Sequence, residues 1–293
     1  MSGETEISSY RLEKVLVCTD NSPLSQGALN AALSLARSFG CQVHLLQVVE
    51  LFPFYEFPQP DLVTISPQLT QDLLNLRENA AREHLEACKA TAGQQGVDLE
   101  TRLRLGTSVY GEILEETQEI KPDLIILGRR GRTGLERLMM GSVTARVIGH
   151  SPVNVLVVPR GATLDFKRLL IASDGSSYSD AALAVSFSLA RKTGAALLGV
   201  CVAREESELE AAQGILERLK AKAEQEAVVL EPRLLQGRPF EALVRFSQEE
   251  GINLIILGSH GHTGLKRLLM GSVAERVIGQ TPCPVLVVKR VEE

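Results

Sequence analysis

The feature that most constrains this chain is an internal repeat. Residues 124–160 and 254–290 align without a gap, and about two thirds of the aligned residues are identical. A repeat separated by so many residues indicates duplicated domains, because the repeats of solenoid proteins are much shorter. The length of 293 residues also fits roughly two domains. We expect the first domain over residues 10–160 and the second over residues 166–290, with a short linker between them.

Both halves alternate short apolar strands with helical segments. This order is typical of an α/β fold in which helices cover both faces of a parallel sheet. We expect each half to form a doubly wound, five-stranded parallel sheet of order 3-2-1-4-5, flanked by helices. Ser22 and Pro23 are typical of a helix start. The expected strands are residues 14–19, 42–49, 98–105, 123–127 and 153–158, then 167–173, 195–202, 228–235, 253–257 and 284–288.

The last strand of each half is strongly apolar, at Val153–Val158 and Val285–Val288. Such a strand at a sheet edge invites pairing with another strand. With two copies in one chain, we expect them to pair as an intramolecular pseudo-dimer; whether this unit forms a further homodimer stays open. Residues 51–68 are an insertion in the first half with four prolines and four aromatic residues. The insertion is a loop packed on the next helix, a lid or a dimer contact.

Composition excludes several classes of protein. The net charge of −5 gives no basic footprint for nucleic acid. No apolar run approaches the roughly 18 residues of a membrane span, and the N-terminus has no apolar segment typical of a signal peptide. The five scattered cysteines form no CxxC pair and fit a reducing compartment. We therefore expect a cytoplasmic protein.

Each half carries a glycine-rich segment after its fourth strand, at Gly128–Ser142 and Gly258–Ser272. Glycines allow close approach of a ligand, and a helix N-terminus favours a phosphate. Neither segment has the GxxxxGK[ST] pattern of a P-loop. The predicted strand order places each segment beside the end of the first strand, where Asp20 and Asp174 lie. A carboxylate repels phosphate, and so we place both aspartates toward a base, a ribose hydroxyl or a metal ion. The alternative is that the glycines only form turns and Ser142 only caps a helix.

The spacing G-x2-G-x9-G-S, found twice, resembles that of the ATP-binding members of the universal stress protein family. The endings PVNVLVV and PCPVLVV resemble that family as well. The likeness covers nearly the whole chain twice, as in tandem two-domain members. It implies an adenine-nucleotide site in each half, holding ATP with or without magnesium. The matching residues are Asp20, Val48, Gly128, Gly131, Gly141, Ser142, Val143 and Thr144 in the first half, and Asp174, Val200, Gly258, Gly261, Gly271, Ser272 and Val273 in the second.

The resemblance also implies roles for these residues. The backbone of Val48 and of Val200 would meet the adenine, while the glycines and the helix start would hold the ribose and phosphates. Ala274 replaces Thr144 in the second half, so that one hydroxyl is lost there.

The two glycine-rich segments differ in charge. Arginines strengthen anion binding, and so one hypothesis is that the first half binds ATP more tightly at neutral pH. The alternative is that these arginines are solvated loop charges. The two histidines of the second segment have no carboxylate nearby in sequence, and we expect no metal site. The residues concerned are Arg129, Arg130 and Arg132 in the first segment and Ser259, His260 and His262 in the second.

No catalytic constellation can be placed, because the sequence offers neither a Ser/His/Asp set nor an acid pair. We expect a sensor or regulator in stress response that acts through partner proteins. One alternative is an enzyme, a slow metal-dependent ATPase on the same fold. Another is a chaperone-like scaffold that binds no nucleotide.

Overall fold

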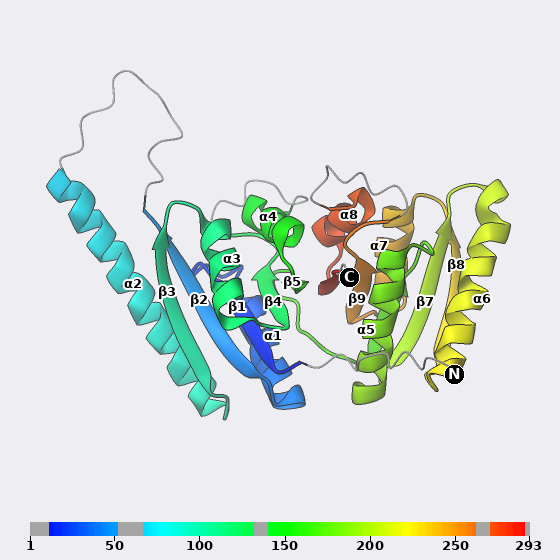
Figure 1. Cartoon of the computed structure of the whole chain (residues 1–293), viewed down its shortest axis with the longest axis horizontal. Coiled ribbons are helices and arrows are strands. Elements are labelled where there is room, and N and C mark those ends of the chain that lie inside the picture. The colour runs from blue at the N-terminus through cyan, green and yellow to red at the C-terminus, as the bar shows by residue number, and fades with distance from the viewer. Residues whose placement is uncertain (1–11, 52–66, 132–139, 262–269, 291–293) are drawn as a thin grey trace, which may run out of the picture.

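A computed structural model describes residues 12–51, 67–131, 140–261 and 270–290 (Figure 1). The insertion at residues 52–66 lies outside the described residues, and its three interpretations stay open. The described elements of the first half are β1 (Lys14–Thr19), α1 (Gln26–Phe39), β2 (Gln42–Glu50), α2 (Pro67–Gln94), β3 (Leu99–Gly106), α3 (Val109–Ile120), β4 (Leu124–Gly128), α4 (Ser142–His150) and β5 (Asn154–Val158).

The second half repeats this order of strands and helices. Its described elements are β6 (Arg168–Ala172), α5 (Ser177–Thr193), β7 (Ala196–Ala203), the short 3-10 helix η1 (Glu206–Glu208), α6 (Leu209–Gln225), β8 (Leu230–Gln236), α7 (Pro239–Glu249), β9 (Leu254–Gly258), α8 (Ser272–Gln280) and β10 (Val285–Val288). Runs of Val, Ile and Leu form the central strands because they suit a sheet buried on both faces.

The ten described strands form one sheet, in the order β3-β2-β1-β4-β5-β10-β9-β6-β7-β8. Neighbouring strands within each half are parallel. Counted within its own half, each set of five strands has the predicted order 3-2-1-4-5, which confirms the doubly wound fold. The order reverses between the first and fourth strands, and so the loops that follow these two strands meet at one edge of the sheet.

The two halves join where β5 pairs with β10. This pair is antiparallel, and Leu156 lies directly opposite Leu286. The last four residues of β5 are buried, and so are all four residues of β10. The predicted intramolecular pseudo-dimer is confirmed, because the apolar edge strands of the two halves pair with each other within one chain.

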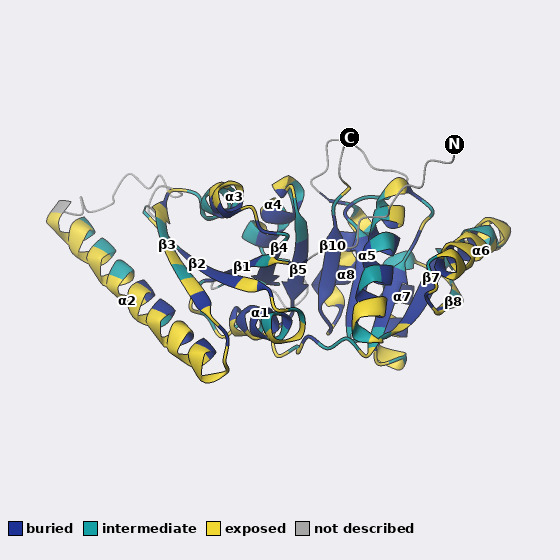
Figure 2. Ribbon diagram, turned by 60° about the horizontal axis from the view of Figure 1, so that its bottom comes forward, coloured by how far each residue is buried: buried dark blue, intermediate teal, exposed yellow. Residues whose placement is uncertain are grey.

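Two apolar cores lie on opposite faces of the sheet, and both extend across the joint between the halves. One contains residues of α1, α2, α5 and α6, and the other contains residues of α3, α4, α7 and α8. Figure 2 shows the buried strands between these helices. The two halves therefore share their interior as well as their sheet. No helix of the described residues is long and apolar enough to cross a membrane.

The start of α1 differs from the sequence prediction. Ser22 and Pro23 form part of a turn closed by Ser25 N–H on Ser22 O at 3.1 Å, and the helix begins at Gln26 with Ser25 at its N-cap. The reason is that the Asp20 carboxylate binds both the N–H and the hydroxyl of Ser22. These bonds hold the chain in a turn that competes with the helix.

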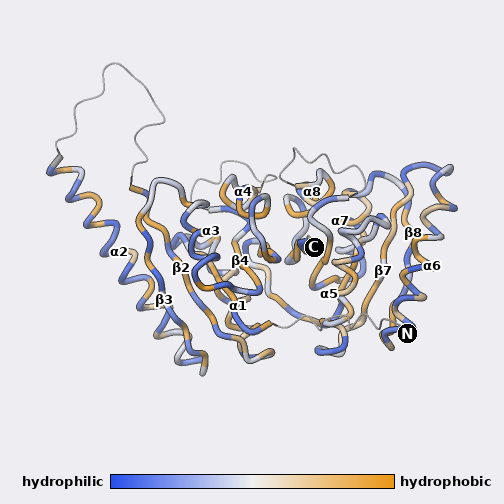
Figure 3. Tube along the Cα trace, viewed as in Figure 1, coloured by the Kyte–Doolittle hydropathy of each residue, from blue (hydrophilic) through white to orange (hydrophobic). Residues whose placement is uncertain are grey.

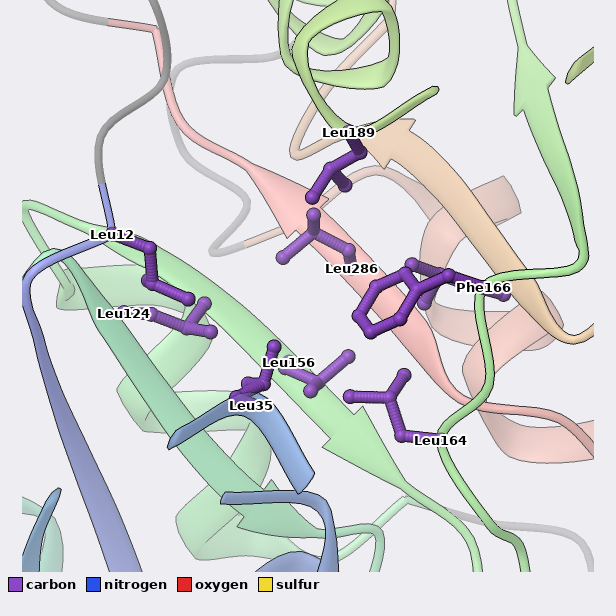
Figure 4. A pocket seen from close by; sticks show the side chains of 9 residues that line it. Leu12, Leu35, Leu124, Leu156, Leu164, Phe166, Leu189 and Leu286 are labelled. Carbon is purple, nitrogen blue, oxygen red and sulfur yellow. The ribbon is translucent and has the colours of Figure 1, made fainter. Parts of the chain in front are cut away.

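A small apolar cavity of about 20 Å³ lies at the joint, and Figure 4 shows side chains of both halves around it. Its lining is apolar and comes from both halves. The residues that line it are Leu12, Leu35, Leu124, Leu156, Leu164, Phe166, Leu189, Leu254 and Leu286.

We predict that Leu286→Ala lowers the free energy of unfolding by about 2–5 kcal/mol. The side chain is 3% exposed, and its loss enlarges a cavity that already exists. Urea unfolding followed by circular dichroism measures the change. Leu105→Ala is the control, because Leu105 is 45% exposed and its truncation leaves no cavity. Because the cores are shared, one transition should move as a whole; a shift confined to half of the signal would contradict the shared interior.

Candidate functional site

Asp20 is the first residue after β1, and its carboxylate faces the glycine-rich segment. A β-carbon on Gly131 would lie 2.8 Å from Asp20 Oδ2. The other oxygen, Oδ1, accepts hydrogen bonds from the backbone N–H of Ser22 at 3.1 Å and from its hydroxyl at 2.6 Å. The carboxylate is therefore fixed in orientation, and glycine is the residue that fits opposite it.

The second half repeats this arrangement. A β-carbon on Gly261 would lie 2.4 Å from Asp174 Oδ2, while Oδ1 accepts a hydrogen bond from Ser176 N–H at 3.0 Å. The residue after each aspartate has a left-handed backbone, with φ of 60° at Asn21 and 80° at Gly175. The predicted meeting of the aspartate with the glycine-rich segment is thus observed in both halves.

The other side of each candidate site is a helix N-terminus. α4 begins at Ser142 after the N-cap Gly141, a residue with no side chain to form a capping hydrogen bond. Ala145 N–H is the donor to Gly141 O, at 2.9 Å. The N–H groups of residues 142–144 therefore have no partner within the helix, and the helix dipole adds positive potential. Ser142 is exposed, and the alternative that it only caps α4 is wrong.

α8 begins in the same way, with Ser272 and Val273 following the N-cap Gly271 and no capping side chain. Ser272 is exposed and Val273 is half-buried, as are their counterparts Ser142 and Val143. The two helix starts therefore present the same set of backbone donors.

Thr144 is buried, and its hydroxyl donates a hydrogen bond to Gly128 O at 3.0 Å. It fixes the end of β4 against the start of α4. Ala274, its counterpart, cannot make this bond. Close packing at the glycine is common to both halves, because a β-carbon on Gly128 would lie 2.9 Å from Leu24 O and one on Gly258 would lie 2.8 Å from the backbone of Tyr178.

The strand registers correct one predicted equivalence. Val200 lies opposite Ala172, two residues before the aspartate that follows β6. The residue at this place in the first half is Leu46, and the counterpart of Val48 is therefore Val202. Both Val48 and Val202 are half-buried, whereas Val200 is fully buried. A slip of two residues keeps the same face of a strand, and so the apolar pattern does not reveal it.

The position of Arg129 does not fit the hypothesis that the arginines of the first segment strengthen ATP binding. Its guanidinium crosses to the second half and donates to Thr281 O at 2.9 Å and to Ile278 O at 3.4 Å. These carbonyls lie at the C-terminal end of α8, where a cation is favourable. Burial lowers the pKa of Arg129, and the neighbouring Arg130 lowers it further. The guanidinium still remains charged at neutral pH.

Lys289 makes the reciprocal contact from the second half. Its ammonium group donates to Ile148 O near the C-terminal end of α4, and its backbone N–H donates to Asn154 Oδ1 at 2.9 Å. Burial lowers the pKa of Lys289 to about 8. Each half thus caps the last helix of the other with one cation, but from positions that are not equivalent in the repeat. Arg132 and His262, the other charges of interest, lie outside the described residues.

Two histidines make contacts near the candidate sites that the sequence does not predict. The ring of His260 lies 5.2 Å from that of Tyr178, beside the end of β9. In the first half, His84 Nε2 lies 3.2 Å from Thr19 Oγ1, next to Asp20. Burial lowers the pKa of His84, and the Asp20 carboxylate opposes this shift. Neither contact has a local sequence signal, because the partners come from different elements.

The described residues hold no cluster of three or more His, Cys, Asp or Glu side chains that could bind a metal ion. The five cysteines are free and buried, and burial raises the pKa of each thiol. A thiol with a raised pKa is a poor nucleophile. The cysteines are therefore core residues.

Comparison with known proteins decides the family. The model of the "Universal stress protein family" matches residues 11–159 and again residues 165–289. The chain belongs to the universal stress protein family. Universal stress protein MJ0531 of Methanocaldococcus jannaschii is 34% identical over 148 residues, which cover 50% of this chain and 82% of that protein.

Two further matches span nearly the whole chain. Universal stress protein Slr1230 of Synechocystis sp. is 27% identical over 292 residues, which cover 94% of this chain and 99% of that protein. The crystal structure of a universal stress protein from Archaeoglobus fulgidus has a TM-score of 0.74 at 23% identity. The match covers 97% of this chain and 99% of that chain. The tandem fold described above is therefore shared within the family.

We predict that the pH dependence of stability will change when Lys289 is replaced by methionine. The pKa of Lys289 is about 8 in the folded protein and about 10.5 in the unfolded chain. Between these values the unfolded chain binds more protons than the folded protein, and so stability rises with pH. The free energy of unfolding of the natural protein, relative to Lys289→Met, should therefore increase from pH 8 to about 10.5.

Urea unfolding at a series of pH values measures this difference. Lys220→Met is the matched control, because the Lys220 side chain is 60% exposed. A difference curve for Lys289→Met that is as flat as the control curve would contradict the burial of a charged ammonium group at the joint.

Proposed function

We propose that each half binds one adenine nucleotide, with ATP as the expected ligand. We also propose that the protein acts as a ligand-responsive regulator in stress response. The carboxylates of Asp20 and Asp174 would meet the base or the ribose. The backbone amides at the starts of α4 and α8 would receive the phosphates. Magnesium would then enter with the phosphates of the nucleotide.

One observation carries this proposal: the same geometry is built twice. In each half an oriented carboxylate stands against a glycine, and an uncapped helix start follows the same loop. A glycine that only formed a turn would not need to stand against an acidic side chain. The family resemblance of the G-x2-G-x9-G-S spacing supports ATP as the ligand.

The further residues of the proposed site lie on or beside the same elements. They are Val48 on β2 with Gly128, Gly131, Gly141, Val143 and Thr144 in the first half, and Gly258, Gly261, Gly271, Ser272 and Val273 in the second. The corrected register adds Val202 as the second-half residue that corresponds to Val48.

Regulation fits this site better than rapid catalysis. Oδ1 of each aspartate already accepts hydrogen bonds from the following turn, which favours a positioning role over that of a general base. A nucleotide that favoured one arrangement of the glycine-rich loops would shift the population that partners meet. Slow ATP hydrolysis is the alternative, and magnesium-dependent release of phosphate distinguishes it from binding alone.

We predict that calorimetric titration with ATP and magnesium will give two sites per chain, and that Gly131→Val and Gly261→Val will each remove one. The new β-carbons would lie 2.8 Å and 2.4 Å from a carboxylate oxygen and would fill the site. At a ligand concentration of 100 Kd, binding should stabilise the protein by about 2.7 kcal/mol per site. Melting curves therefore provide a second measurement.

Gly93→Val is the matched control, because nothing lies within 4 Å of a β-carbon at that position in α2. The site that each variant retains shows that the variant is folded. If the natural protein binds no nucleotide, the proposal is wrong; if both glycine variants keep two sites, nucleotide binds elsewhere.

A further inference from the structure

α2 is longer than its counterpart in the second half. It has 28 residues, whereas α6 has 17. The C-terminal part of α2 packs on the sheet through Ala81, Leu85, Cys88 and Ala92, which are all buried. The N-terminal part extends beyond the region where these residues pack (Figure 1). Apolar residues nevertheless recur along the whole helix (Figure 3).

The leucines of the N-terminal part face in another direction. Leu69, Leu73 and Leu76 are 50%, 36% and 65% exposed. Their spacing, continued by Ala80, forms one stripe along the helix. At 3.6 residues per turn this stripe is rotated by roughly 120° from the buried one. Leu74 lies on the sheet-facing side and is only half-exposed, in agreement with this rotation. The leucine stripe is therefore not a continuation of the core.

We propose that the leucine stripe, residues 69, 73, 76 and 80, binds the same stripe of a second copy of this chain. The stripe occupies alternating d and a positions of a heptad, the pattern of a coiled coil. On this register Asp72 is at position g and Arg77 is at the next position e. These two positions meet across a parallel pair of helices, and in a two-fold symmetric pair their opposite charges meet twice.

The placement of the stripe leaves room for both molecules. The sheet lies roughly 120° around the helix from the stripe. A two-fold axis along the helix pair turns the direction of the second sheet by half a turn. The two bodies therefore extend from opposite sides of the pair, and neither lies in the path of the other.

The flanks of the stripe also suit a self-association that is reversible. On this register positions e and g beside the stripe are Thr70, Asp72, Arg77 and Asn79, whose charges cancel, so that identical helices approach without net repulsion. Gln68, Gln71 and Asn75 lie on the outer side of the helix, at positions c and f, where Gln68 donates a hydrogen bond to Asp72 and Gln71 donates one to Asn75. The stripe spans only about three turns, and so we expect micromolar or weaker association. This inference does not depend on nucleotide binding.

Sedimentation velocity of the whole chain, from low-micromolar to near-millimolar concentration, tests the proposal. The natural protein should pass from monomer to dimer. Leu76→Glu should abolish the dimer, and Asp72→Arg should raise Kd by about tenfold, because two attractive contacts become repulsive. An equimolar mixture of Asp72→Arg with Arg77→Asp should restore dimers, since each chain then supplies the charge that the other lacks.

Val229→Glu is the control, because Val229 is 90% exposed in the second half and lies outside the stripe. It should leave the dimer unchanged. A natural protein that is monomeric throughout, as when another part of its own chain covers the stripe, would overturn the proposal. A dimer that survives Leu76→Glu would overturn it as well, and so would a charge-reversed mixture that does not associate.

Discussion

The pairing of β5 with β10 is the contact on which the rest of the structure depends. Each strand would otherwise be an apolar edge, exposed to aggregation. Their antiparallel pairing joins two five-stranded sheets into one sheet of ten strands. It also makes both apolar cores continuous across the two halves. Arg129 and Lys289 then connect each half to the last helix of the other.

Most of the fold could be predicted from the sequence because two strong patterns agree. The repeat fixes the number of domains, and the alternation of apolar strands with helices fixes a parallel sheet. The strand order then places Asp20 beside Gly131 and Asp174 beside Gly261, as the structure has it. This part of the site follows from topology, since the ends of the first and fourth strands of a doubly wound sheet must meet.

The errors concern side chains whose partners are distant or whose pattern is degenerate. Ser22 has the composition of a helix cap, but the Asp20 carboxylate holds it in a turn. Val200 was matched to Val48 because a slip of two residues preserves the face of a strand. Arg129 follows a strand that leads to the glycines, yet its guanidinium reaches helix carbonyls about 150 residues away, as no local pattern can indicate.

Within the glycine-rich segments the two halves differ in side-chain charge. Arg130 in the first segment corresponds to His260 in the second, and His260 lies against Tyr178. The Arg129 guanidinium binds carbonyls of the second half. Among the described residues of the first segment, Arg130 is therefore the arginine through which the first half could bind an anion more tightly. The pKa of His84, lowered by burial beside Asp20, adds a further difference between the halves. Two sites with the same backbone geometry would thus bind the same nucleotide with different affinity.

The most direct test of the account is a crystal structure of the chain grown with ATP and magnesium. The account predicts nucleotide density in both halves. In each, the base or ribose should contact Asp20 or Asp174, and the phosphates should lie at the start of α4 or α8. Density elsewhere, or phosphates against the aspartates, would contradict the proposed sites.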